Sequence, residues 1–548
     1  MKKLFPRILV VFFLQIYISG VTCAQDKGFE ISKNLEIFAN VYKNVHLNYV
    51  DDVDPGKLMK TAIDAMLASL DPYTNYYAES DIEDVKLQLL GEYGGVGALI
   101  HQQDGMIYVA EPYEGLPADK AGLKAGDRIV EVNGVSTDGK TTSDVSSAMR
   151  GQSGTDVKLK IERDGKLFER TLTRQEIKLP NVPYSGMVDG GVGYIKLSEF
   201  TQDASKNVRD AFKKLKSQNP ALKGLIIDLR GNGGGLMNEA VEIVGMFVKR
   251  GELVVETKGK IATKNVKSYT RNVPEDTEIP IAVLIDGYSA SASEIVSGSL
   301  QDFDRAVIIG SRSYGKGLVQ NILPMAYNTQ MKVTVSKYYI PSGRCIQAID
   351  YSHRDENGRA IRVPDSLKTA FKTRNGRTVY DGFGIEPDIE VEQEYMSALS
   401  VVLIQKFLIF NYATQFVKTH ASIPPASQFE ITDEIYDDFR RFLAGKDYAY
   451  STSTEKYLDD LKTIAKEEKY YEAVEKDIAA LEAKLKNDKA DDLTKYRQEI
   501  SEMLKSEILS RYYYQKGRVE GALKEDKDVM KAVEILTDQS QYRKILGR

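Results

Sequence analysis

The chain has 548 residues, more than one hydrophobic core usually serves, so three or four domains are expected. Hydrophobic residues make up 42% and charged residues 28%, with 42 Gly and 16 Pro, which excludes a mainly disordered or fibrous protein. The 74 Lys and Arg face 79 Asp and Glu, giving a net charge of −5. No basic run is long enough to follow a phosphate backbone, so nucleic acid is not expected as a partner.

Cysteine and histidine are too few for a metal centre or a disulfide framework. The two cysteines are Cys23 and Cys345, the four histidines are scattered, and neither a CxxC nor an HExxH pattern occurs. Such patterns supply the ligands of the common zinc sites. We therefore expect no metal and no cofactor.

The first residues have the pattern of an export signal. Three basic residues lead into an apolar run, and small residues surround Cys23 at the position of a cleavage site. The apolar run is shorter than the roughly 20 residues that span a bilayer, which disfavours an uncleaved anchor. We expect removal of residues 1–24, a mature chain beginning near Gln25, and export, with the periplasm as the simplest destination. A lipid anchor on Cys23 is the weaker alternative.

Residues 25–85 are expected to form a leading helical segment. Apolar residues recur at helical spacing between residues 30 and 70, and the turn residues 54–56 interrupt the pattern. Two helices are therefore predicted. The second ends before Pro72, because the residue preceding a proline is pushed out of the helical region.

Residues 86–177 change to short β-type runs separated by Gly and Asp turns, which predicts a compact and mostly β module. The glycine cluster at 93–97 and the eighteen-residue segment 117–134 resemble a PDZ domain. In that family a glycine-rich loop presents N–H groups to a peptide's terminal carboxylate, and the peptide adds as a strand. The resemblance implies a carboxylate-binding loop made of Gly94, Gly95, Val96 and Gly97. A plain tight turn is the alternative.

Residues 178–390 alternate buried-strand runs with helical periodicity, which predicts an α/β core. The expected strands are 193–197, 224–229, 281–285 and 306–309, and the expected helices are 203–217, 236–249 and 291–303. A charged insertion at 346–382 interrupts this core. Residues 391–548 are expected to be a helical extension whose charge runs are solvated helix faces.

Three glycine- or serine-rich turns follow strands of this core, where α/β folds place their sites. The first runs from Asp228 to Leu236, and free N–H groups at a helix start suit a developing oxyanion. A dinucleotide fingerprint is the rival, but Leu236 stands where its last Gly belongs. A purely structural turn remains an alternative.

The second turn, Ser289–Glu294, leads from a strand into a helix. A serine exposed there has the geometry that an acyl-transfer nucleophile requires. The GxSxG pattern fails at its final position. Helix capping is the commoner use of serine at such a place.

The third turn, Gly310–Gly317, meets the first seven positions of a phosphate-binding loop, GxxxxGK. Gly317 lacks the hydroxyl that would bind magnesium, and a strand rather than a helix is expected after it. A buried lysine there has a lowered pKa and can act as a neutral general base. An exposed surface lysine is the alternative.

Together with segments 341–344 and 384–389, these turns resemble the carboxyl-terminal processing peptidases of serine protease family S41, over about residues 30–395. The resemblance implies a crotonase/ClpP-like core with a Ser–Lys dyad. The residues that it implies are Ser291 as nucleophile, Lys316 as general base, Gln320 to orient the lysine, and the N–H groups of Gly235 and Ala292 as oxyanion donors.

The sequence therefore predicts a multidomain α+β protein. Its expected parts are the signal 1–24, the helical segment 25–85, the PDZ domain 86–177, the peptidase core 178–390 and the helical extension 391–548. Its expected function is that of an exported serine endopeptidase that binds exposed C-terminal tails of protein or peptide substrates and cuts near that end. An inactive PDZ scaffold is the main alternative and a nucleotide hydrolase the third. Self-association and proximity to a membrane stay open.

Overall fold

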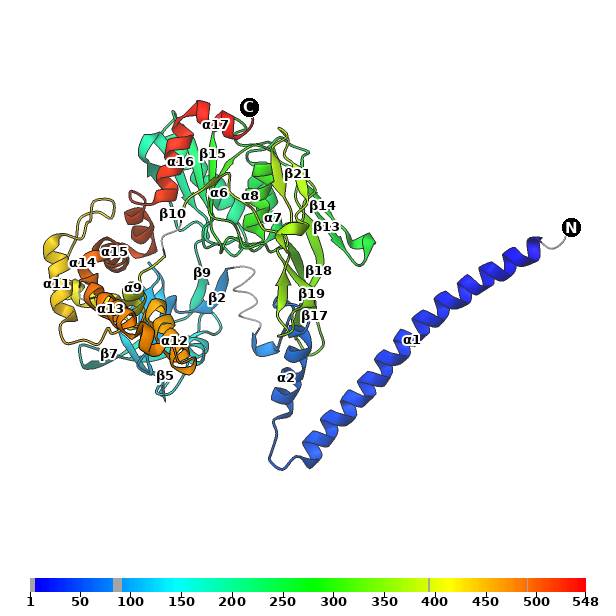
Figure 1. Ribbon diagram of the computed structural model, residues 1–548, viewed down its shortest axis with the longest axis horizontal. Helices are drawn as coiled ribbons and strands as arrows, with labels where there is room; N and C mark the ends of the chain where they lie inside the picture. The colour runs from blue at the N-terminus through cyan, green and yellow to red at the C-terminus, as the bar shows by residue number, and fades with distance from the viewer. Residues whose placement is uncertain (1–4, 82–90, 393–394, 490) are drawn as a thin grey trace. The chain divides into compact units, whose positions relative to one another are not determined.

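The computed structural model describes residues 5–81, 91–392, 395–489 and 491–548, and the chain divides into two compact units. The smaller unit comprises Met1–Glu79 and Gln320–Thr334, and the larger comprises Ser80–Val319 and Val335–Arg548. Figure 1 labels some of their elements.

The smaller unit begins with two helices, as predicted. These are α1 (Phe5–Asn48) and α2 (Pro55–Ala68). Asp54 caps α2 by accepting the Lys57 N–H at 3.0 Å, and the proline after it suits the first helical position because no donor is lost there. Asp54 therefore starts α2, whereas α1 has already ended at Asn48. Strand β1 (Asn75–Tyr77) pairs antiparallel with β18 (Gln330–Tyr339), and β17 (Leu318–Pro324) also pairs with β18.

The predicted β module of the larger unit is confirmed. Its main sheet has the order β3-β4-β5-β7-β8, with β6 beside β5, and β2 pairs separately with β9. Its elements are β2 (Glu92–Gly95), β3 (Ala98–Gln103), β4 (Met106–Pro112), α4 (Pro117–Lys120), β5 (Arg128–Val132), β6 (Val135–Ser136), α5 (Thr142–Met149), β7 (Asp156–Arg163), β8 (Lys166–Thr173) and β9 (Gln175–Lys178).

Side-chain alternation gives this module its core. Val157, Leu159 and Ile161 on β7 are fully buried, because every second residue of a strand points to the same face. Asp164 and Gly165 connect β7 to β8 with φ angles of 53° and 72°. Both angles are positive, as the two-residue turn that matches strand twist requires.

The core of the larger unit is a six-stranded sheet in the order β10-β11-β12-β15-β16-β23. Strands from β11 onward are parallel, and β10 is antiparallel to β11. The strands are β10 (Tyr184–Val188), β11 (Val192–Lys196), β12 (Gly224–Asp228), β15 (Ile281–Ile285), β16 (Val307–Gly310) and β23 (Ile389–Glu390). The four strands predicted from buried runs match β11, β12, β15 and β16 to within one residue at each end.

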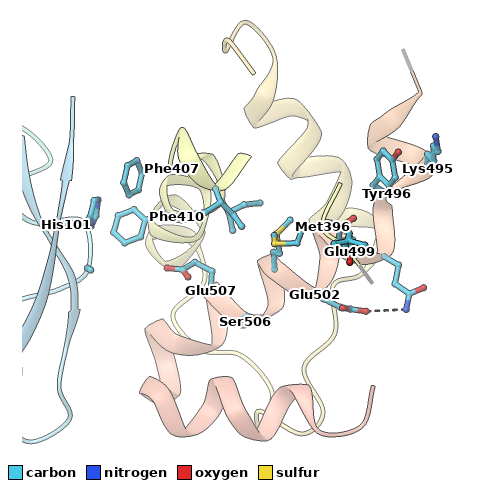
Figure 2. A pocket seen from close by; sticks show the side chains of 16 residues that line it. His101, Met396, Phe407, Phe410, Lys495, Tyr496, Glu499, Glu502, Ser506 and Glu507 are labelled. Carbon is cyan, nitrogen blue, oxygen red and sulfur yellow. Dashed lines mark hydrogen bonds between the residues drawn. The ribbon is translucent and has the colours of Figure 1, made fainter. Parts of the chain in front are cut away.

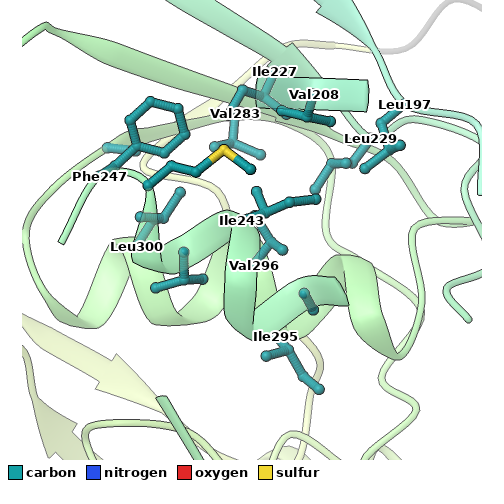
Figure 3. Close-up of a cluster of buried hydrophobic side chains, with 14 of the residues drawn as sticks. Leu197, Val208, Ile227, Leu229, Ile243, Phe247, Val283, Ile295, Val296 and Leu300 are labelled. Carbon is teal, nitrogen blue, oxygen red and sulfur yellow. The ribbon is translucent and has the colours of Figure 1, made fainter. Parts of the chain in front are cut away.

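Both faces of this sheet are covered, so its strands read as continuous apolar runs. Leu225 and Ile227 of β12 pack with the helices α6 (Ala204–Gln218), α7 (Met237–Gly245) and α8 (Ala292–Asp302), as Figure 3 shows in part. Ile226, between them, packs with α16 (Lys527–Thr537) and α17 (Gln539–Ile545), drawn red in Figure 1.

Helix α7 is shorter than predicted. The apolar periodicity predicted a helix to residue 249, but α7 ends at Gly245. The carbonyl of Met246 accepts the N–H groups of Glu275 and Asp276 at 2.8 and 3.1 Å, so a distant loop uses the acceptor that would have continued the helix. The buried residues that follow serve the core without being helical.

The described residues form further strands and short helices. They are η1 (Glu79–Asp81), η2 (Asp189–Gly191), β13 (Leu253–Gly259), η3 (Ala262–Lys264), β14 (Lys267–Tyr269) and, within the insertion, β19 (Ile349–Arg354), β20 (Ala360–Arg362), η4 (Asp365–Leu367), β21 (Ala370–Lys372) and β22 (Thr378–Tyr380). The insertion thus forms two hairpins, β19 with β20 and β21 with β22.

The extension is helical, as predicted. Its further helices are α9 (Ala398–Gln405), α10 (Leu408–Thr419), α11 (Asp433–Leu443), α12 (Ser453–Glu467), α13 (Tyr471–Lys489), α14 (Asp492–Lys495) and α15 (Arg497–Ala522). Helices α9, α10, α11 and α15 share a hydrophobic core of their own. Among the described residues no single helix is long and apolar enough to cross a membrane; α9 and α10, bent by 62°, reach that length and composition only as a pair.

Replacing Arg344 is expected to destabilise the core. Its guanidinium is 1% exposed, lies 2.9 Å from the carboxylate of Asp302 and donates to Gln301 at 2.8 Å. Arg344→Met leaves the Asp302 charge buried and unpaired, which costs about 3 to 5 kcal/mol of unfolding free energy. Urea unfolding in a Ser291→Ala background, which prevents self-digestion, measures the change. A loss below about 1 kcal/mol would show that the pair is dispensable.

Candidate active site

The three turns singled out from the sequence lie at one edge of the core sheet. They follow β12, β15 and β16, which are parallel neighbours, so their carboxyl ends face the same way. The Tyr314 N–H donates to the Ser289 carbonyl at 3.0 Å, and the Ser289 hydroxyl donates to the Leu229 carbonyl at 2.8 Å. One residue of the middle turn is therefore bonded to both of the other turns.

Ser291 occupies the strained point where the chain enters α8. Its backbone has φ 57° and ψ −111°, a conformation that a residue with a side chain rarely adopts and that clusters at functional sites. The residue is partly buried, and its carbonyl accepts the Tyr338 hydroxyl at 3.1 Å. The predicted serine at a strand-to-helix turn is thus present, and Ser291 is also the N-cap residue of α8.

The glycine turn packs directly against Ser291. A Cβ atom on Gly234 would lie 2.8 Å from the Ser291 Cβ and 2.9 Å from the Ala292 nitrogen, so only glycine allows this approach. The carbonyl of Asn232 accepts the Ala290 N–H at 3.0 Å and the Ser293 hydroxyl at 2.8 Å. These bonds hold the glycine turn beside the serine turn.

Two N–H groups at this junction are available to a ligand. The Gly234 N–H is used by the Asn232 side chain at 2.9 Å. Within the described ranges, the hydrogen bonds include no acceptor for the N–H of Gly235 or Ala292. Ala292 starts α8, where the helix dipole favours negative charge. An oxyanion beside Ser291 would find donors here.

A buried carboxylate that the sequence analysis did not single out joins the serine turn to the lysine turn. Oε1 of Glu294 accepts the Ser313 hydroxyl at 2.6 Å and the Gly315 N–H at 2.7 Å. Its Oε2 accepts the Ser291 N–H at 2.7 Å and the Lys316 N–H at 2.9 Å. Glu294 is fully buried. A carboxylate three residues after an N-cap serine is the capping-box pattern, which was the sequence signal for this residue.

Burial disfavours the charged form of Glu294, and hydrogen bonds to its carboxylate favour it. Burial raises the pKa of Glu294 to about 7, although hydrogen bonds from Ser313, Lys316, Ser291 and Gly315 favour the ionised form. A protonated carboxyl would turn one of its oxygens into a donor facing other donors. The carboxylate form therefore accepts all four hydrogen bonds, whereas burial favours the protonated form.

Gln320 belongs to the smaller unit. Its side-chain amide donates to the Thr334 hydroxyl at 3.2 Å, and the Thr334 N–H donates to the Thr74 hydroxyl oxygen at 3.2 Å. Two carboxylate contacts from Asp71 hold Thr74 in turn, through its N–H at 2.8 Å and its hydroxyl at 3.1 Å. The amide of Gln320 is thus held by a chain of polar contacts within that unit.

Of the four residues predicted to form the carboxylate-binding loop, Gly94 and Gly95 instead end β2, where they pair with β9, and Val96 and Gly97 connect β2 to β3. The carbonyls of Val96 and Gly97 accept the Ala118 N–H at 2.8 Å and the Tyr113 N–H at 2.9 Å. For the N–H groups of Val96 and Gly97, the hydrogen bonds of the described ranges include no acceptor. The Val96 side chain lies in the module's core, so a charge introduced there would unfold the module rather than test the loop.

A separate cavity of about 820 Å³ lies between this β module and the helical extension (Figure 2). His101, Ser506 and Glu507 line it, which raises the question of a second catalytic group. The His101 ring, however, stacks on Phe407 and meets Phe410 edge-on, with centroids 4.5 and 4.6 Å apart. Its Nε2 has no hydrogen-bond partner among the described residues. His101 therefore packs as an aromatic side chain, and the hydrogen bonds of the described residues include none between it and Ser506.

Sequence profiles of known families match four stretches of the chain. Peptidase family S41 matches residues 191–353, and a PDZ domain matches residues 108–163. The C-terminal helical domain of a probable PDZ-protease matches residues 399–536, and the N-terminal domain of the activating protease CtpB matches residues 17–81. The resemblances to a PDZ domain and to family S41 are thereby confirmed.

Individual relatives agree with these profiles. A carboxy-terminal-processing protease of Bartonella bacilliformis is 39% identical over 322 residues, 58% of this chain and 73% of that protein. A probable CtpA-like serine protease of Staphylococcus aureus is 33% identical over 314 residues, 57% of this chain and 62% of its own length. A solved structure, the photosystem II D1 C-terminal processing protease, is 26% identical and covers 65% of this chain and 92% of its own, with a TM-score of 0.35.

Replacing Glu294 by Gln is expected to remove a pH-dependent part of the stability. A carboxyl with a pKa near 7 when folded and near 4.5 when unfolded contributes stability below pH 4.5 that is lost as the pH rises to about 7. The difference corresponds to about 3 kcal/mol. Urea unfolding across this pH range in a Ser291→Ala background should show the decline, and adding Glu294→Gln should abolish it. Equal declines in both proteins would contradict the assignment.

Proposed function

Because this chain belongs to peptidase family S41 and is a serine-type peptidase, we propose that it is an exported endopeptidase that binds the C-terminal tails of its substrates and cuts near that end. The observation that carries the proposal is the junction at Ser291. A strained serine packs against the glycine turn, the N–H groups of Gly235 and Ala292 have no acceptor among the described residues, and Glu294 joins the serine to the turn that bears Lys316.

The dyad performs acyl transfer in two stages. The Ser291 hydroxyl attacks the scissile carbonyl while the neutral amine of Lys316 takes its proton. The N–H groups of Gly235 and Ala292 hold the negative oxygen of the tetrahedral intermediate. When the C–N bond breaks, the Lys316 ammonium returns the proton to the leaving amine. Water, deprotonated by Lys316, then attacks the acyl-enzyme and frees Ser291.

Gln320 orients the Lys316 amine in this proposal. An amide is uncharged, so it directs an amine without stabilising the ammonium form as a carboxylate would. The fixed position of the Gln320 amide against Thr334 suits that task. The roles of Lys316 and Gln320 rest on the family resemblance.

Tail binding belongs to the PDZ domain. The N–H groups of Val96 and Gly97 bind the terminal carboxylate, and the preceding substrate residues add as a strand beside β3, which stands at one end of the sheet order. Gly94 precedes the loop at the end of β2, where a Cβ would lie 2.0 Å from the Gly151 carbonyl oxygen. The separation of binding from cutting allows one tail site to serve many cleavage sequences.

Export follows in this proposal from residues 1–24 as a signal, with the periplasm as the place of action. The main rival is an inactive scaffold that only gathers exported proteins through the PDZ domain. Both functions require tail binding, and only the peptidase requires Ser291 and Lys316. Variants of the dyad therefore separate the two.

Ser291→Ala and Lys316→Ala are each expected to reduce cleavage by several orders of magnitude, because each removes a member of the acyl-transfer pair. Lys316→Arg should be equally inactive, since a guanidinium does not give up its proton at working pH. A gel time course of the chain from Gln25 on a loosely folded protein with an apolar tail measures this. Parent-level cleavage by Ser291→Ala would refute the peptidase site.

Amidation of the tail is expected to weaken binding by about tenfold or more, because the charge-assisted hydrogen bonds to the loop need a carboxylate. Fluorescence anisotropy with the Ser291→Ala protein compares the same peptide with a free and an amidated C-terminus. A scrambled peptide with a free C-terminus is the control for nonspecific contact. Equal affinity of the first two peptides would exclude carboxylate recognition.

A further inference from the structure

Arg230 stands at the entrance of the glycine turn, directly after β12. Its carbonyl accepts the Lys196 ammonium at 2.6 Å. The next N–H, of Gly231, donates to the Asp286 carboxylate at 3.0 Å. The backbone that leads to the proposed oxyanion donor is thus held at its first two residues.

The Arg230 side chain is held by carboxylates from the far end of the chain. Its Nη1 lies 3.0 Å from Asp526 and 2.8 Å from Asp528, and its Nη2 lies 2.7 Å from Asp526. On its other side, Asp228 accepts from Nε at 3.1 Å and from Nη2 at 2.7 Å. Arg230, Asp526 and Asp528 are only 20%, 18% and 16% exposed.

Nearby charges favour the ionised form of Asp228. Although burial opposes ionisation, Arg230 and Lys196 hold the pKa of Asp228 well below its usual range. Burial raises the pKa of Asp528, and Arg230 opposes that rise. Asp228 belongs to the core and already contacts Arg230. Asp526 and Asp528, at the start of α16, are additional partners that the extension supplies.

We propose that Asp526 and Asp528 are positioning residues for the glycine turn, acting through Arg230. The inference rests on the proposed function of that turn. With both acids bound, the guanidinium is fixed on two sides, and the backbone from Arg230 to Gly235 is held where the Gly235 N–H meets a developing oxyanion. The helical extension is then a support of the catalytic step and not an appendage.

The test compares two proteins that begin at Gln25 and run to the end of the chain. One is the parent, and the other carries Asp526→Asn and Asp528→Asn together. Asn at 526 has an oxygen that can keep the cap of α16, where Asp526 accepts the Val529 N–H at 3.1 Å, and it removes the charge and one of the two oxygens that accept from Arg230. We expect kcat to fall about tenfold or more with KM and tail affinity little changed, because a displaced oxyanion donor weakens binding of the transition state alone. The pair Lys531→Gln and Glu534→Gln, an exposed ion pair on the same helix, is the matched control and should leave kcat unchanged.

Two controls distinguish the possible outcomes. The Ser291→Ala variant tests the proposed function, and the thermal midpoint shows whether the double variant is folded. Parent-level kcat in the double variant, with Ser291→Ala inactive, overturns this inference and leaves the peptidase intact. Parent-level cleavage by Ser291→Ala overturns the proposed function itself. A loss of kcat no larger than the loss of folded protein, measured by circular dichroism, also overturns the inference. If the double variant does not fold, Asp528→Asn alone and its rescue by Asp528→Glu repeat the comparison.

Discussion

The buried carboxylate of Glu294 is the contact on which the geometry of the site depends. Parallel strands bring the turns after β15 and β16 to the same edge of the sheet, but the pairing ends at Ile285 and Gly310 and does not fix the backbone of the turns beyond them. Four hydrogen bonds to one side chain do so, because they fix the N–H groups of Ser291 and Lys316 on the same oxygen. Burying the charge of Glu294 costs free energy unless these donors are present. The ionised side chain therefore requires the turns that bear Ser291 and Lys316 to stay in place.

Coverage of the sheet on both faces explains why the extension matters. Helix α8, which begins at Ala292, buries one face, and α16 and α17 bury the other. The extension also contacts the PDZ domain, where Tyr514 donates to Asp119 at 2.8 Å and Arg518 donates to Glu111 at 3.1 Å. The charged residues of the extension, which were expected to be solvated, therefore also make ion pairs, and its apolar residues supply core contacts. The sequence of an amphipathic helix shows that one face is apolar but not which part of the chain that face contacts.

Much of the fold was predictable because buried parallel strands leave uninterrupted apolar runs, and β15 was placed to the residue. The end of α7 was not, because the acceptor at Met246 is taken by a loop about thirty residues away. Within the site, Ser291 and the glycine turn carried local signals. The contacts of Arg230 with Asp526 and Asp528 carried none, since about 300 residues separate the partners.

The central claim is that Ser291 carries the acyl group during turnover. Acid quenching of the enzyme with a slowly hydrolysed peptide ester, followed by proteolysis and mass spectrometry, locates that group directly. The account predicts an acyl adduct on the peptide containing Ser291 and a much weaker one in the Lys316→Ala variant. An adduct on another side chain, such as Ser506 in the cavity beside His101, would contradict it.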